Sequence, residues 1–145
     1  MGLGSIVLVL ALLAIAVLAA RSRIRRRRRR DLVLSHRWTR IQSKARTMPD
    51  AGLARVVNVY QRARRGTKAK IVWLTTGRKQ DTWFAGNRPR QGSIVLIRGN
   101  TGWGPHNRDP NVFYVAPNQI LSQVPPGTMK AVRRQQRRDA RRVGH

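Results

Sequence analysis

The N-terminal end of the sequence places an uncharged, apolar run directly before a block of arginine. Residues 2–20 carry no charged side chain, and eight arginines follow within residues 21–30. A helix over the apolar run rises roughly 28 Å, close to the hydrocarbon thickness of a bilayer. By the positive-inside rule the arginine-rich flank stays cytoplasmic and the short N-terminus lies outside. The pattern predicts a single-pass protein of the cell inner (cytoplasmic) membrane, with a transmembrane helix over residues 2–20.

The charge of the chain restricts its partners. Thirty-one Lys and Arg stand against five Asp and no Glu, and the formal net charge is +26. Such an excess indicates a polyanionic partner, which could be nucleic acid, anionic membrane lipid or an acidic surface polymer. The predicted polyanion-binding residues are the arginines of residues 21–30 and the basic residues of the C-terminal tail: Arg21, Arg23, Arg25, Arg26, Arg27, Arg28, Arg29, Arg30, Lys130, Arg133, Arg134, Arg137, Arg138, Arg141 and Arg142.

The residue types that most enzymes need are scarce. The chain has no cysteine, its three histidines are scattered, and no two of its five aspartates are close enough in sequence to suggest a carboxylate pair. Without a nucleophile, acid pair or metal-ligand spacing, we expect no enzyme, no metal site and no cofactor.

Two helical segments are predicted after the arginine block. Within residues 21–48 apolar residues recur at intervals of three and four, which is typical of a basic amphipathic helix. Its Trp38 could lie at a membrane interface, or its apolar face could pack on a folded domain. Residues 49–66 read as a second helix, with Asp50 as N-cap and Gly66 as the stop.

The pattern changes from residue 67 onward. Short apolar runs at residues 71–75, 82–85, 93–98, 112–116 and 119–124 are separated by turn residues such as Gly77, Pro89 and Pro117. Five short strands with this punctuation predict a small antiparallel β-barrel over residues 67–125. The remaining residues, 126–145, form a basic tail that starts at the Pro125-Pro126-Gly127 break and is either disordered or partly helical.

Four short motifs lie within residues 70–125. They are Asp81-Thr82-Trp83-Phe84, Gly92-Ser93-Ile94-Val95-Leu96-Ile97, Gly102-Trp103-Gly104 and Pro117-Asn118-Gln119-Ile120. Their order resembles that of SH3-like β-barrels, in which a Gly-Trp motif and a proline turn precede the last strand. By this resemblance Trp83 and Trp103 could be residues of a ligand groove, or at least one of them could belong to the core of the barrel. In peptide-binding members of the family acidic residues line that groove, whereas this chain places Arg88 and Arg90 there, which favours an anionic ligand.

The fold class expected from the sequence is therefore a membrane-anchored α+β protein: a transmembrane helix, a basic helical region, an SH3-like antiparallel β-barrel and a basic C-terminal tail. The expected function is non-enzymatic binding of polyanions, either nucleic acid or lipid headgroups, at the cytoplasmic membrane face. Two alternatives stay open. One is a cell-envelope protein that binds wall polymers after signal cleavage, and the other is a small accessory protein for lysis or assembly, for example from a phage.

Overall fold

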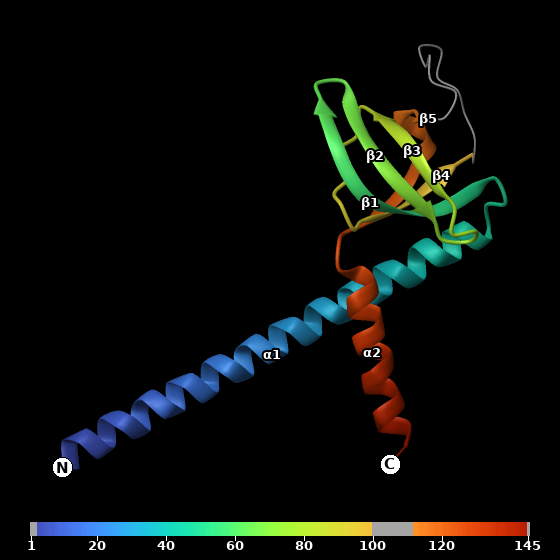
Figure 1. Cartoon of the computed structure of the whole chain (residues 1–145). Helices are drawn as coiled ribbons and strands as arrows, with labels where there is room; N and C mark the ends of the chain where they lie inside the picture. Colours follow the sequence, from blue (N-terminus) through green and yellow to red (C-terminus); the bar gives the residue numbers. More distant parts are fainter. Residues whose placement is uncertain (1–2, 100–111, 145) are drawn as a thin grey trace.

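The computed structural model describes the backbone of residues 3–99 and 112–144, with side chains for residues 8, 10–99 and 112–144. Within these residues a long helix leads into a curled sheet, and a second helix follows the sheet (Figure 1). The helices are α1 (Leu3–Arg46) and α2 (Thr128–Val143); the strands are β1 (Ala51–Ala63), β2 (Gly66–Trp73), β3 (Lys79–Ala85), β4 (Ile94–Arg98), β5 (Val112–Val115) and β6 (Ile120–Val124).

The six strands form one mixed, strongly curled half-barrel with the order β5-β3-β2-β1-β4-β6. All neighbouring strands are antiparallel except β3 and β5, which run parallel. The expected antiparallel SH3-like barrel is therefore wrong in two respects, because the sheet is mixed and it has a sixth strand. The five strands expected from the sequence are all present, as β2 to β6.

The strands at the two edges of the sheet, β5 and β6, are consecutive in the chain. Only residues 116–119 separate them, and these include a 3-10 turn, Pro117–Gln119. Five residue steps from Val115 to Ile120 span at most about 18 Å. The sheet must therefore curl until its two edges come within that distance of each other.

The helix expected over residues 49–66 is wrong, because this segment forms β1 and the turn after it. The pairing of β1 with β2 shifts its register between Val56 and Asn58 and again between Val59 and Gln61. An extra residue at a shift breaks the alternation of a strand. As a result Val56 and Val59 both contact the same core although they are three residues apart, a spacing that resembles a helical face.

The protein has two apolar cores. The first lies in the concavity of the sheet and contains Phe84, Ile71, Val95 and Phe113, among others. The second joins the helices to β4 and β6 and consists of Trp38, Ile41, Ile94, Leu96, Val124 and Val132. Trp38 is only 9 % exposed. Trp38 therefore packs on the folded domain, which is one of the two places predicted for this apolar face.

The N-terminal part of α1 extends away from the sheet (Figure 1). Its described large apolar side chains, from Leu8 to Leu18, are 47–64 % exposed. No helix in the described part of the chain is long and apolar enough to span a membrane. The prediction of a transmembrane helix over residues 2–20 is therefore wrong for the residues that the structure describes.

The basic C-terminal tail is an ordered helix. Residues 128–143 form α2, which contacts α1 and buries Thr128, Ala131 and Val132. Of the two alternatives for this tail, the helical one is confirmed. The buried side chains form one short face, and the basic residues occupy the rest of the helix.

Candidate polyanion-binding surface

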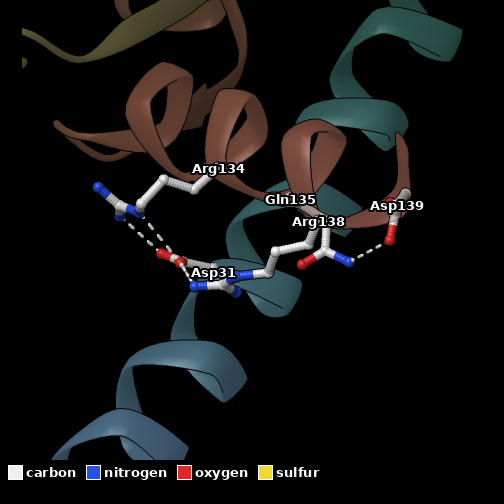
Figure 2. Close-up of polar contacts among 5 residues, drawn as sticks. All are labelled: Asp31, Arg134, Gln135, Arg138 and Asp139. Carbon is white, nitrogen blue, oxygen red and sulfur yellow. Dashed lines mark hydrogen bonds and ion pairs between the residues drawn. The ribbon is translucent and has the colours of Figure 1, made fainter. Parts of the chain in front are cut away.

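A buried carboxylate joins the two helices. Asp31 of α1 is only 1 % exposed, although arginines precede it in the chain. It accepts two hydrogen bonds from Arg134 of α2, from Nε at 3.1 Å and from Nη2 at 2.7 Å, and a third from Nη2 of Arg138 at 3.1 Å. Figure 2 shows both guanidinium groups pointing at this carboxylate. Because a bidentate pair fixes orientation as well as distance, Asp31 sets the position of α2 on α1.

The spacing of residues along each helix explains this contact. Asp31, Leu34, Trp38 and Ile41 follow one another at intervals of three and four residues. Asp31 therefore lies on the same face of α1, the face that packs on the rest of the protein. Arg134 and Arg138 are four residues apart and therefore share one side of α2. The same helical register that buries the second core thus brings one carboxylate to two arginines.

The electrostatics of Asp31 follow from these contacts. The hydrogen bonds from Arg134 lower the pKa of Asp31 below its ordinary value, although burial opposes the shift. Nearby positive charge on Arg134, Arg138 and Arg27 acts in the same direction as the hydrogen bonds. Asp31 is therefore ionised at neutral pH. A carboxylate with a lowered pKa stabilises the docked helices at neutral pH, and this contribution is lost as the pH falls from about 3.9 through the lowered value.

We expect Asp31→Asn to weaken the docking of α2 by about 1–2 kcal/mol. Both guanidinium groups are about one-third exposed, so water screens them and the loss stays below the ~3–5 kcal/mol of a fully buried pair. The chain has no cysteine, so dyes attached through His36→Cys and Ala140→Cys can report the distance between α1 and α2. The parent pair should separate in acid below pH ~4, whereas the Asn variant should already separate more easily at neutral pH and should not show this acid-dependent step.

Asp139→Asn is the matched control. Asp139 is exposed, and its described partner is the side chain of Gln135, which donates a hydrogen bond to Oδ1 at 3.0 Å (Figure 2). Equal dye distances for Asp31→Asn and Asp139→Asn across the pH range would show that the carboxylate of Asp31 does not hold α2.

Two hollows lined by arginine lie beside this contact. The first, of about 330 Å³, is lined by Ile24, Arg27, Arg28, Arg134, Arg137, Arg138 and Arg141. The second, of about 260 Å³, is lined by Arg28, Leu32, Gln135, Arg138, Arg141 and Arg142. We refer to the two hollows together as the arginine cleft. Among the described residues, the only ion pairs made by the arginines of this cleft are those of Arg134 and Arg138 with Asp31. The cleft therefore carries a large uncompensated positive charge.

The other predicted binding residues surround the cleft or lie elsewhere. The remaining arginines of residues 21–30 are exposed on α1, while Lys130 and Arg133 are exposed on α2. Arg88 and Arg90 are exposed between β3 and β4, and Trp83 is half-buried on β3. Trp103, the other predicted groove residue, lies outside the described residues. The structure thus brings together arginines from both basic segments, and the hollows that form the cleft include none of the predicted groove residues.

The role of Asp31 was not predicted from the sequence. The signal that could have identified it is an isolated acid at the start of an apolar helical face, since a charge on such a face needs a partner when it is buried. Gln135 was missed as well, and nothing in the sequence separates it from the neighbouring Gln136.

A separate hollow of about 360 Å³ lies at the start of β1. Trp73, Gln80, Arg78 and Asp50 are among the residues that line it, and Nε1 of Trp73 donates a hydrogen bond to Oε1 of Gln80 at 2.9 Å. Arg78 is the one basic residue among those that line it, so this hollow does not match a polyanion. In the described part of the chain, no group of three or more His, Cys, Asp or Glu side chains could hold a metal ion.

Comparison with known proteins adds no assignment to this geometry. No protein-family model matches the chain, and no curated protein or solved structure shows significant similarity to it.

Proposed function

We propose that the protein binds nucleic acid through its arginine cleft and the neighbouring arginines of α1 and α2, without catalysing a reaction. The observation that carries this proposal is the meeting of six guanidinium groups from two helices around the first hollow, where Asp31 contacts only two of them. A guanidinium group presents a fork of N–H donors that matches the oxygens of a phosphate.

The shape of the site favours the phosphates of a polymer over a flat layer of headgroups. The cleft is a pair of hollows between crossing helices, and the exposed arginines of residues 21–30 are on α1 beside it. A flat anionic surface would meet only the outermost arginines of such a site. A strand of nucleic acid can enter the cleft while neighbouring phosphates contact arginines on either side, which releases more counterions.

The residues that line the cleft predict weak sequence preference. Apart from arginine they are Ile24, Leu32 and Gln135. Contacts to phosphate fix the register of a protein on nucleic acid, whereas base edges are read mainly by other hydrogen-bonding and apolar groups. The described cleft also lacks an aromatic side chain on which an unpaired base could stack, so duplex is the expected form.

A salt titration of duplex binding tests this proposal. For four to six phosphate contacts the log affinity should fall against log salt with a slope of about −3.6 to −5.4. Two unrelated duplexes of equal length should bind with affinities within about threefold of each other. The full chain is used, with a nonionic detergent in every sample because the large apolar side chains at the start of α1 are exposed.

Vesicles of anionic phospholipid provide the competing ligand in the same titration. Salt-dependent binding to both duplexes, at higher affinity than to vesicles, supports the proposal. Binding to anionic vesicles without binding to duplex would show that the ligand is a lipid surface and not nucleic acid. Affinity that does not change with salt would show that the ligand is not a phosphate.

A further inference from the structure

The two hollows of the arginine cleft have a common wall. Arg28 of α1 and Arg138 and Arg141 of α2 line both of them. Arg137 lines only the first hollow, and Arg142 lines only the second. The cleft is thus two adjoining basic compartments divided by shared guanidinium groups.

The chemistry of guanidinium makes such a wall suited to two anions at once. Each group has five N–H donors and no acceptor, so one group can donate to anions on both of its sides. Arg138 is held in the wall by its hydrogen bond to the buried Asp31. Asp31 is therefore a positioning residue for the wall.

From this arrangement we infer that the cleft binds two successive phosphates of one ligand molecule, one in each hollow, with Arg28, Arg138 and Arg141 between them. Where that ligand is a strand of nucleic acid, the inference rests on the proposed function. A free nucleoside 3′,5′-bisphosphate presents the same two phosphates on either side of one sugar, so the site chemistry is shared. Linked phosphates gain affinity because filling the second hollow becomes an intramolecular step.

Calorimetric titration of the full chain with adenosine 3′,5′-bisphosphate and with adenosine 5′-monophosphate tests the inference. The bisphosphate should bind one to one and at least about 100-fold more tightly than the monophosphate. Arg141→Gln, which alters both hollows, should weaken bisphosphate binding more than Arg137→Gln or Arg142→Gln, each of which alters one hollow. Arg64→Gln is the matched control, since this arginine is exposed in the turn after β1 and lines neither hollow.

The same four variants are then titrated with duplex, which separates the two claims. If the parent protein binds duplex but Arg141→Gln and Arg64→Gln weaken both ligands equally, the proposed function stands and the paired site is overturned. If bisphosphate binding follows the predicted order but the parent binds no duplex, the paired site stands as a site for a free bisphosphate and the proposed function falls. Equal affinity for the monophosphate and the bisphosphate also overturns the paired site.

Discussion

Replacing Phe84 by alanine should lower the free energy of unfolding of the sheet by about 3–5 kcal/mol. Phe84 lies on β3, is 0 % exposed and packs in the first core with Ile71, Val95 and Phe113. Truncation removes the buried ring and leaves a cavity in a core that can close over it only partly. Urea denaturation followed by tryptophan fluorescence measures the loss, and one of the four tryptophans, Trp73, belongs to the same core as Phe84.

Leu74→Ala is the control for this prediction. Leu74 directly follows β2 and is 39 % exposed, so its truncation should cost less than about 1 kcal/mol. A denaturation midpoint that is the same for both variants would show that the concave side of the sheet is not the main core.

Reversing two charges in the arginine cleft should reduce duplex affinity at low salt by at least about 100-fold. Arg137→Glu combined with Arg141→Glu removes two guanidinium groups from the first hollow and places two carboxylates there. Each change removes a contact that releases counterions and adds repulsion between like charges. The salt slope should become shallower by about 1.8 if both arginines contact phosphate. Equilibrium binding to a labelled duplex at several salt concentrations measures both quantities.

Arg64→Glu combined with Arg65→Glu changes the net charge of the chain by the same amount. Both arginines are exposed in the turn between β1 and β2, away from the residues that line the cleft. This control should lose less than about tenfold in affinity. Equal losses in the two double variants would mean that binding depends on total charge and not on the cleft.

The sequence predicted the fold well where each element has one dominant periodicity. The face of α1 that contains Trp38 and Ile41, and strands β2 to β6, follow from simple helical or strand spacing. The helix predicted over residues 49–66 failed because the register shifts in β1 give Val56 and Val59 a helix-like spacing. Such irregularities depend on the partner strand, which periodicity in one segment does not contain.

The candidate site was predicted only as a list of basic residues. Their meeting depends on the contact between Asp31 and Arg134, which are 103 residues apart in the chain. A sequence without an alignment gives no pairing information at that separation. The N-terminal run was interpreted as a membrane span from its lack of charge and the arginines that follow it, whereas no helix in the described part of the chain is long and apolar enough to be one.

The short connection between β5 and β6 also governs how the sheet meets other molecules. Both edge strands are fastened to each other through residues 116–119, so the sheet cannot flatten without breaking that connection or its strand pairing. Flat, open edges are the surfaces through which β proteins add foreign strands and aggregate. Cleavage of the chain within residues 116–119 would free both edges together. The intact segment should therefore reduce strand exchange between copies of the protein.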